Sequence, residues 1–419
     1  MKDVKILAPK GTHDVLPDES YIWQDIESKM MAICRNFGYN EIRFPTFEHT
    51  ELFNRGVGDT TDVVQKEMYT FNDKGDRSIT LRPEGTASTV RSFIEHSLYG
   101  QALPAKMCYL ISCFRYERPQ AGRFREFRQF GVENFGSNSA YTDAEVITLA
   151  MELLSSAGVK GLKLYINSIG CVECRKKYNE VLKSFLNSKK ESLCGLCMDR
   201  IDRNPLRVLD CKNKDCQVIL EDAPTVDSVL CEDCVKHFDT LKKALTELGL
   251  DYEVDTGLVR GLDYYTKTVF EIKSEDLGAQ STVCGGGRYD GLIEQLGGPS
   301  TPGIGFSIGL ERLISIVQKQ NTVTAEKPAP KLYIASMGEE ATALAFKCVT
   351  ALRKNNISAE FDHLGKSVKA QMKYADKIGA KFSIVLGDDE IAQMKAKCKN
   401  METGESFDID INELAKGNF

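Results

Sequence analysis

Five arginines lie among aromatic residues in the segment FRYERPQAGRFREFRQF, residues 114–130. Its Arg-Pro-Gln-Ala-Gly stretch has turn residues, which predicts two strands joined by a loop. Because side chains alternate along a strand, each strand should present one face of polar and aromatic groups. These groups are Arg115 and Glu117 before the loop, and Phe127, Gln129 and Glu133 after it. A guanidinium matches phosphate oxygens, a ring stacks on a purine, and a carboxylate holds an amine or an imidazole. The segment indicates a site for a phosphorylated purine; the alternative is a surface hairpin held by arginine–glutamate pairs.

The segment TLRPEGT, residues 80–86, has groups suited to an amino ligand. Gly85 permits a tight turn into a helix, which leaves Glu84 and Thr86 near the amino end of that helix. A carboxylate there can bind an α-amino group. The alternative is a capping box for the helix that we expect to run to His96.

In LVRGLDYY, residues 258–265, Arg260 stands beside Gly261 and a tyrosine pair follows. The glycine lets a ligand approach the backbone, the arginine can neutralise a phosphate, and the hydroxyls of Tyr264 and Tyr265 can face an imidazole. The alternative for the tyrosine pair is packing within a strand.

Two glycine-containing segments follow. GIGFSIGLERL, residues 303–313, should end in a helix that carries Arg312, which either reaches a ligand or pairs with Glu311 or solvent. CGGGRYDGL, residues 284–292, lacks the Lys-Ser/Thr of a P-loop and therefore is not predicted to be one.

Eight of the fourteen cysteines lie between residues 171 and 234 and form four pairs. The pairs are Cys171/Cys174, Cys194/Cys197, Cys211/Cys216 and Cys231/Cys234. Taken in order, they give C-x2-C-x19-C-x2-C and C-x4-C-x14-C-x2-C, spacings typical of four-thiolate zinc sites. We predict two structural Zn²⁺ sites with the pairs combined in sequential order, although four pairs can combine in three ways. Disulfides and free thiols are the alternatives.

The elements that must position these groups follow from hydrophobic periodicity. A core-facing helix is predicted over residues 19–36, and a strand with an irregular position at Pro45 follows it. A capping box at Thr142 and Glu145 predicts a buried helix that ends near residue 158. The first 160 residues lack regular strand–helix alternation, so we predict an α+β domain, an antiparallel sheet flanked by helices.

The last hundred residues differ in pattern. Residues 318–330 resemble a linker, and residues 331–419 show strand, helix, strand, helix, strand, which predicts a small α/β domain. Four lysines are expected on one face of a helix in that domain, where they either meet a phosphate backbone or simply face solvent: Lys366, Lys369, Lys373 and Lys377.

The composition narrows the function classes. Lys and Arg number 54 against 60 Asp and Glu, a net charge of −6, so nucleic acid would be bound through local patches and not through bulk charge. No segment approaches the roughly 18 apolar residues that a membrane span needs. The amino terminus lacks the apolar core of a signal peptide, so we expect a cytoplasmic protein with reduced thiols and no membrane partner.

Six segments together resemble the histidyl-tRNA synthetases, a family of class II aminoacyl-tRNA synthetases. FPTFEHTELF around Pro45 resembles motif 1, the arginine-rich hairpin resembles motif 2, and GIGFSIGLERL resembles motif 3. GTHDVLP, TLRPEGT and LVRGLDYYTKTVFE agree in the same order, and LVRGLDYY is particular to the histidine enzymes. The resemblance implies a catalytic domain over residues 1–325, interrupted by a Cys-rich insertion at residues 171–245, and an anticodon-binding domain over residues 331–419. Many family members lack these cysteines, so the resemblance does not support the zinc sites.

The resemblance also implies a reaction and a role for each site residue. The substrates are L-histidine, ATP with Mg²⁺, and tRNA(His), the intermediate is histidyl-adenylate, and the enzyme is a homodimer. Arg260 and Arg115 are implied as catalytic cations, with Arg260 at the α-phosphate. Implied histidine-binding residues are Glu84, Thr86, Gln129, Glu133, Tyr264 and Tyr265. Implied ATP-binding residues are Arg115, Glu117, Arg123, Phe127 and Arg312, the last at the γ-phosphate. The run at residues 284–292 is implied as a glycine-rich wall that lets the amino acid sit close.

Two other functions compete with this one. A regulatory paralogue that partners a phosphoribosyltransferase typically loses the Arg260 motif and the anticodon-binding domain, and this sequence has both. A zinc-dependent nucleic-acid-binding or redox module would leave the arginine-rich hairpin and LVRGLDYY unexplained.

Overall fold

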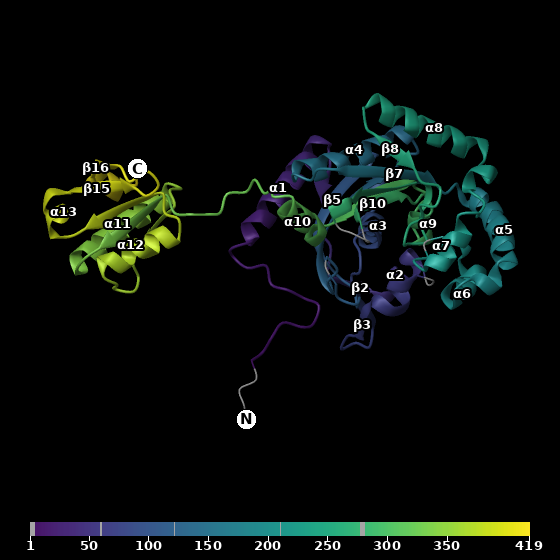
Figure 1. Ribbon diagram of the computed structural model, residues 1–419, viewed down its shortest axis with the longest axis horizontal. Coiled ribbons are helices and arrows are strands. Elements are labelled where there is room, and N and C mark those ends of the chain that lie inside the picture. The colour runs from purple at the N-terminus through teal and green to yellow at the C-terminus, as the bar shows by residue number, and fades with distance from the viewer. Residues whose placement is uncertain (1–4, 59–60, 121, 210, 277–280) are drawn as a thin grey trace. The chain divides into compact units, whose positions relative to one another are not determined.

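The structure is a computed structural model that divides into two compact units, Met1–Ala325 and Glu326–Phe419 (Figure 1). The residues that it describes are 5–58, 61–120, 122–209, 211–276 and 281–419. No helix within these ranges is long and apolar enough to span a bilayer.

Unit 1 is built on an eight-stranded sheet with the order β1-β5-β6-β11-β10-β9-β7-β8. In that order the strands are β1 (Asn40–Glu41), β5 (Ala105–Phe114), β6 (Glu126–Phe135), β11 (Gly303–Gly309), β10 (Thr282–Arg288), β9 (Thr266–Ser274), β7 (Leu162–Ser168) and β8 (Tyr252–Val254). The six central strands pair antiparallel, and only the two edge pairings are parallel. The predicted antiparallel sheet is therefore confirmed.

Four helices cover one face of this sheet: α1 (Ser20–Asn36), α4 (Ala140–Ser156), α8 (Glu232–Glu247) and α10 (Leu310–Lys319). Their apolar side chains share one core with alternate residues of the central strands, such as Val132 and Phe306. The period of two leaves the intervening positions, such as Gln129 and Glu133, on the opposite face. That opposite face carries the candidate site.

The opposite face is flanked by shorter elements. They are α2 (Thr50–Val57), α3 (Thr86–Glu95), α9 (Leu292–Gln295), a π-helical turn at Val63–Glu67, and a three-stranded sheet of β2 (Phe47–His49), β4 (Ser78–Leu81) and β3 (Tyr69–Asn72). Val90 and Phe93 of α3 pack in a second core with Tyr264, Tyr265 and Tyr289. This core fixes the helix whose amino end lies at the site.

Two local predictions need correction. The strand predicted around Pro45 is split into β1 and β2, because proline has no N–H for a ladder; the carbonyls of Phe44 and Pro45 instead accept from Nη1 of Arg82, each at 2.9 Å. The capping box at Thr142 is wrong. Helix α4 begins earlier, at Ala140, where the Ser139 hydroxyl caps it by accepting from the N–H of Tyr141 at 3.2 Å.

The Cys-rich stretch is helical, with α5 (Val172–Ser188), α6 (Gly195–Arg203) and α7 (Lys214–Leu220) around a core of its own. The insertion was expected to end at residue 245, but the residues before that boundary do not all pack with the Cys-rich stretch. Helix α8, which carries the last cysteine pair, inserts Phe238, Leu241 and Leu245 into the large core beneath the main sheet.

Unit 2 confirms the predicted strand–helix alternation. Strands β13 (Ala359–Phe361), β12 (Leu332–Ser336) and β14 (Phe382–Leu386) pair in parallel, and the hairpin β15 (Lys395–Asn400) and β16 (Ser406–Asp410), which was not predicted, extends the sheet antiparallel. Its helices are α11 (Glu339–Lys354), α12 (Val368–Lys377), α13 (Asp388–Gln393) and α14 (Ile411–Lys416). The linker begins later than residue 318, because α10 continues to Lys319.

Lys369, Lys373 and Lys377 lie on α12 and are exposed, as predicted. Lys366 precedes the helix and is not part of that face; its ammonium lies 5.8 Å from the ring centroid of Tyr374.

Candidate active site

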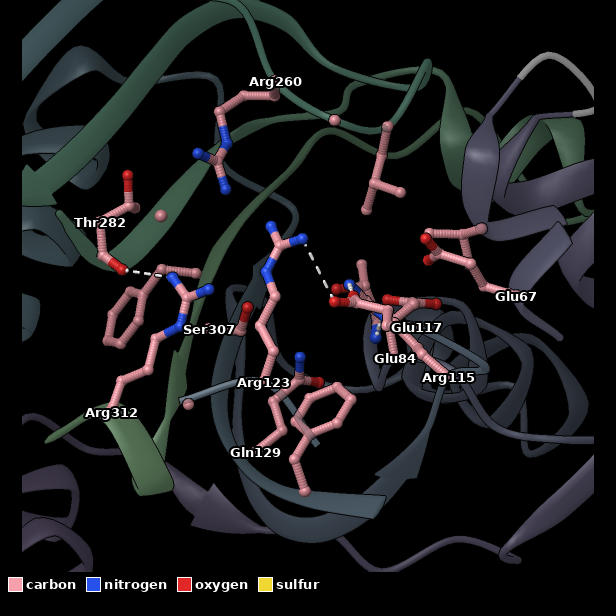
Figure 2. Close-up of a pocket in the computed structure, with 18 of the residues that line it drawn as sticks. Glu67, Glu84, Arg115, Glu117, Arg123, Gln129, Arg260, Thr282, Ser307 and Arg312 are labelled. Carbon is pink, nitrogen blue, oxygen red and sulfur yellow. Dashed lines mark hydrogen bonds and ion pairs between the residues drawn. The ribbon is translucent and has the colours of Figure 1, made fainter. Parts of the chain in front are cut away.

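A cavity of about 410 Å³ opens on the face of the main sheet opposite the large helical core. Three arginines from distant parts of the chain line it: Arg115 after β5, Arg260 before β9, and Arg312 on α10. Figure 2 shows them, with Arg123 of the hairpin loop, around one space. These guanidinium groups could bind the oxygen atoms of an anionic ligand such as a phosphate.

Arg115 is held by its own hairpin and by the segment before α3. Its Nε donates to the carbonyl oxygen of Pro83 at 2.8 Å, and its guanidinium lies 5.4 Å from the ring centroid of Phe127. Its Nη1 is 3.9 Å from Glu117, whose other oxygen is 3.3 Å from Nη1 of Arg123 (Figure 2). The alternative for this segment was a surface hairpin held by arginine–glutamate pairs. Such pairs are present, but their side chains line the cavity.

Arg260 forms an ion pair with Glu271 of β9, a partner that its position in the sequence did not indicate. Glu271 also accepts from the hydroxyl of Thr282 at 2.9 Å. A Cβ at Gly285 would lie 2.2 Å from Nη2 of Arg260. Because Gly285 has no side chain, the guanidinium of Arg260 can lie against its backbone.

Arg312 points from the first turn of α10 toward the cavity. Its Nη1 donates to the carbonyl oxygen of Thr282 at 2.9 Å (Figure 2), and its Nε donates to that of Gly122 at 3.2 Å. The neighbouring Glu311 accepts from the N–H of Arg128 at 2.7 Å, so that carboxylate binds the hairpin backbone. Burial raises the pKa of Glu311 to about 7.

Glu133 is fully buried behind the cavity, and its partners Thr86 and Tyr289 are among the residues that line it. Glu133 accepts hydrogen bonds from the hydroxyls of Thr86 at 2.8 Å, Tyr109 at 3.0 Å, and Tyr289. Burial raises its pKa to about 8. A carboxyl group in this state can share a proton with an imidazole, whose own pKa lies near 6.5.

Tyr109 and Tyr289 were not predicted to belong to the site. The alternation along β5 places Tyr109 on the face that carries the cavity, but only the pairing of β5 with β6 brings it to Glu133. Tyr289 comes two residues after the glycine run, just past the end of β10, where its N–H donates to the carbonyl oxygen of Gly303 in β11 at 2.9 Å. No signal in the sequence links either tyrosine to Glu133.

Glu84 and Gln129 define the floor of the cavity. Glu84 accepts from the backbone N–H groups of Thr86 at 2.7 Å and Ala87 at 2.9 Å, so its carboxylate satisfies two N–H groups at the amino end of α3. The capping box that was the alternative is not formed, because the N-cap residue is Gly85, which has no side chain. Glu84 and Thr86 also line the cavity, and burial raises the pKa of Glu84. Gln129 Oε1 accepts from the N–H of Gly85 at 3.0 Å, which fixes the turn into α3.

Tyr264 and Tyr265 are buried and line the cavity. Their ring centroids are 4.7 Å apart, and both rings belong to the core that holds α3. The two tyrosines therefore pack in a core and also face the cavity, so both of the roles considered for them are possible at once.

The eight cysteines of the 171–234 stretch form two clusters outside the cavity. The sulfur atoms of each cluster lie within 4.8 Å of one another. The clusters are Cys171, Cys174, Cys231 and Cys234, called here the junction cluster, and Cys194, Cys197, Cys211 and Cys216, called the distal cluster. The predicted sequential pairing is wrong: the first pair joins the fourth and the second joins the third. The chain folds back on itself within the stretch, so its two ends meet.

A family model described as "Histidyl-tRNA synthetase" matches residues 11–313. This chain belongs to the histidyl-tRNA synthetase family. The protein named histidine–tRNA ligase of Caldanaerobacter subterraneus subsp. tengcongensis is 56% identical over 410 residues, which cover 98% of each chain. The protein of the same name from Acetivibrio thermocellus is 55% identical over 407 residues, 97% of this chain and 98% of that one.

Structural comparison agrees with this family. The apo histidyl-tRNA synthetase of S. aureus superposes with a TM-score of 0.84 at 41% identity, covering 98% of this chain and 99% of that one. A model described as "Anticodon binding domain" matches residues 331–417. The chain therefore has a class II synthetase-like catalytic domain followed by an anticodon-binding domain, as the family resemblance implied.

Proposed function

We propose that this chain attaches L-histidine to tRNA(His) in an ATP-dependent reaction through a histidyl-adenylate, with release of pyrophosphate and AMP. Family membership supports the reaction. The observation that carries the assignment of the site is the convergence of Arg115, Arg260 and Arg312 on one cavity. Two other residues that line this cavity, Thr86 and Tyr289, hydrogen-bond the buried carboxyl group of Glu133 behind it. One end suits a triphosphate and the other suits an imidazole.

Histidine binds at the inner end in this proposal. Glu84, held by two backbone N–H groups, attracts the α-ammonium together with Thr86. Glu133 receives one imidazole nitrogen, and the phenols of Tyr264 and Tyr265 face the other. Gln129 keeps the Gly85 turn in place beneath the amino acid.

ATP binds at the outer end. Phe127 stacks on the purine, Arg115 and Arg260 face the α-phosphate, and Arg312 reaches the γ-phosphate. Glu117 and Arg123 close the hairpin over the nucleotide; their ion pair at 3.3 Å couples the two sides of the loop.

The cavity also has oxygen donors suited to Mg²⁺. Glu67 and Glu117 both line it, and the pKa of Glu67 is raised by burial and by the neighbouring Glu117 carboxylate. A divalent cation relieves such repulsion, and Mg²⁺ prefers one or two carboxylates together with substrate phosphates. These two residues would hold the ion, which neutralises triphosphate charge.

The reaction needs positioning and charge stabilisation more than proton transfer. A histidine carboxylate oxygen attacks the α-phosphorus, the bond to the bridging oxygen breaks, and pyrophosphate leaves with that electron pair. Negative charge grows on phosphate oxygens, and Arg115 and Arg260 are already placed to receive it. The adenylate then acylates a ribose hydroxyl at the tRNA 3′ end, and AMP leaves.

Unit 2 is proposed to bind the anticodon region, with Lys369, Lys373 and Lys377 facing the phosphate backbone. We also expect a cytoplasmic homodimer, in line with the family and with the motif 1 segment around Pro45. Light scattering that gives twice the 46.7 kDa chain mass would agree with the dimer.

The two cysteine clusters are proposed as structural Zn²⁺ sites of a small inserted domain. Zinc–sulfur bonds of about 2.3 Å in a tetrahedron place sulfur atoms about 3.8 Å apart. Cys171 and Cys174 have sulfurs 3.6 Å apart, and Cys194 and Cys211 have sulfurs 3.9 Å apart. Both distances fit thiolates around one ion and are far from the roughly 2.05 Å of a disulfide.

The decisive experiment is the histidine-dependent exchange of labelled pyrophosphate into ATP. We expect exchange with L-histidine and none with the other amino acids, followed by transfer to tRNA(His). A regulatory paralogue or a zinc-binding nucleic-acid module would show no exchange, and that result would refute the proposed function.

A further inference from the structure

The junction cluster lies where the Cys-rich stretch leaves the main sheet and returns to it. Cys171 comes three residues after the end of β7, with Cys174 in the first turn of α5, and Cys231 and Cys234 open α8, which leads to β8. Each pair spans the first turn of a helix, with Cys171 and Cys231 as the N-cap residues of α5 and α8. The N–H of Cys231 donates to the sulfur of Cys174 at 3.1 Å. The cluster thus ties the amino ends of two helices together.

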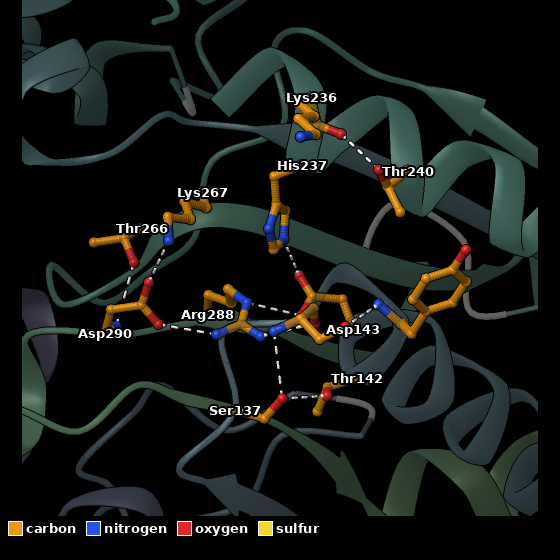
Figure 3. Close-up of polar contacts among 12 residues, drawn as sticks. Ser137, Thr142, Asp143, Lys236, His237, Thr240, Thr266, Lys267, Arg288 and Asp290 are labelled. Carbon is orange, nitrogen blue, oxygen red and sulfur yellow. Dashed lines mark hydrogen bonds and ion pairs between the residues drawn. The ribbon is translucent and has the colours of Figure 1, made fainter. Parts of the chain in front are cut away.

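Helix α8 is the fixed side of this tie. His237 Nε2 lies 2.8 Å from Asp143 of α4, and Asp143 lies 2.7 Å from Arg288 of β10 (Figure 3). Asp143 and Arg288 are both fully buried. Phe238 and Leu241 of the same helix pack in the large core. The position of α8 is therefore set by the catalytic sheet.

Helix α5 is the side that reaches the candidate active site. Arg175 follows Cys174, and its Nη1 donates to the carbonyl oxygens of Tyr265 at 2.6 Å and Asp263 at 3.4 Å. Gly170, just before the cluster, accepts from the N–H of Lys267 at 2.8 Å. Arg175 is not among the residues that line the cavity, so it acts on the loop from behind.

The distal cluster has a corresponding pair of side chains. Asn204 and Arg207 lie between its two cysteine pairs, after Cys197 and before Cys211. Asn204 Nδ2 donates to Asp263 Oδ1 at 2.8 Å, and Arg207 donates to the carbonyl oxygen of Gly261. Both contacts meet the same loop, residues 258–265, on which Arg260, Tyr264 and Tyr265 lie.

We infer that the Cys-rich insertion is a metal-dependent clamp on loop 258–265, so that zinc occupancy of the two thiolate clusters sets the affinity of the enzyme for histidine. As each ion binds, four thiols release their protons and four zinc–sulfur bonds form. The junction bonds fix α5 against α8, and the distal bonds fix α6 against α7, on either side of the Asn204–Arg207 turn. The side chains of Arg175, Asn204 and Arg207 transmit these positions to the loop. The part that concerns histidine rests on the proposed function; the metal and the loop contacts do not.

The first test counts metal in protein purified anaerobically. We expect two zinc ions per chain in the native protein, and one in Cys234→Ser and in Cys216→Ser. We also expect the Co²⁺-substituted protein to show thiolate charge-transfer bands. Native protein without zinc would overturn the inference.

The second test uses Arg175→Ala, which keeps every metal ligand, with Lys176→Ala as the matched control because Lys176 is exposed on the same helix. We expect Arg175→Ala to retain two zinc ions, to raise the KM for histidine about ten-fold with a smaller change in kcat, and to speed amide hydrogen exchange in residues 258–265. Cys234→Ser should show the same loop exchange. If Arg175→Ala leaves both KM and loop exchange at the values of the control, the clamp is refuted. Native protein that performs no histidine-dependent pyrophosphate exchange would instead refute the proposed function, and the metal count and loop exchange would still decide the clamp.

Discussion

The cavity arginines and the lysines of α12 carry the same charge, but they are held in opposite ways. Arg260 pairs with Glu271 and lies in the space left by Gly285, and Arg312 donates to two backbone carbonyls. Lys369, Lys373 and Lys377 are exposed along a helix face. A guanidinium with fixed partners can stabilise charge at one point in space, whereas a mobile ammonium in water contributes charge without geometry.

This difference predicts different responses to mutation. Preorganised donors in a partly buried site lower the barrier of one reaction and depend little on salt. Exposed charges are screened over about 8 Å at physiological ionic strength, so their contribution is small and salt-dependent.

The largest effect is expected for Arg260→Ala. Removing a preorganised donor typically lowers the rate by ~10²–10³, and we expect that loss in histidine-dependent pyrophosphate exchange at saturating substrates. Arg43→Ala is the control, because Arg43 is exposed and pairs only with Glu41 at 2.7 Å among the described residues. Exchange within three-fold of the control would break the distinction between the two kinds of cation.

The next largest effect is expected for a variant that moves the guanidinium of Arg260 without removing its charge. Gly285→Ala keeps the guanidinium but places a Cβ 2.2 Å from its original Nη2 position, so the arginine must move. A misplacement of about 1 Å can cost about 10² in rate. Gly291→Ala is the matched control, since a Cβ there meets nothing within 4 Å. Equal exchange rates for the two variants would show that the position of the charge is unimportant.

A third effect concerns the other end of the cavity. Burial raises the pKa of Glu133 from 4.5 to about 8. Between these two pH values the carboxyl group is therefore protonated in the folded protein and ionised in the unfolded chain. The stability that this proton provides is complete below pH 4.5 and is lost as the pH rises through about 8. Thermal melts should show wild type losing stability relative to Glu133→Gln between pH 6 and pH 8.5. Glu95→Gln, at a site 59% exposed, should melt in parallel with wild type. Parallel curves for Glu133→Gln as well would contradict the raised pKa.

The smallest effect is expected on α12. Replacing Lys369, Lys373 or Lys377 by Ala should reduce the slope of log Kd for tRNA(His) against log salt by about one unit per lost phosphate contact, with pyrophosphate exchange unchanged. Lys397→Ala is the control, because this lysine pairs with Asp408 at 2.9 Å in the β15–β16 hairpin. A slope identical to that of the control would mean that the α12 lysines only face solvent.

Local alternation made part of the cavity predictable. The period of two correctly grouped Phe127, Gln129 and Glu133 on the cavity face of β6, because side-chain direction in a strand depends only on position in that strand. Turn and helix signals likewise placed Glu84 at the start of α3. The capping box predicted at Thr142 failed because α4 begins earlier. Ser139, three residues before Thr142, is the N-cap residue and accepts from the N–H of Tyr141.

Contacts between distant segments were not predictable in this way. The tyrosines around Glu133, the pairing of Arg260 with Glu271, and the nested cysteine clusters depend on which strands are neighbours and on where helices return. Spacing gave the correct cysteine pairs, because each pair spans only a few residues. It could not choose among the three ways to combine them, because that choice depends on the fold of all the residues between.

Residue types and short spacings were enough to indicate the kinds of chemistry available: guanidinium forks for phosphate, a carboxylate at a helix start for an amine, and thiol pairs for zinc. These follow from covalent geometry over a few residues and do not depend on the rest of the chain. Tertiary structure alone decided that Arg115, Arg260 and Arg312 meet at one cavity and that the Cys-rich stretch contacts the loop carrying Arg260. Such meetings are set by strand order and by burial of the large core, which joins α1, α4, α8 and α10 to the central strands.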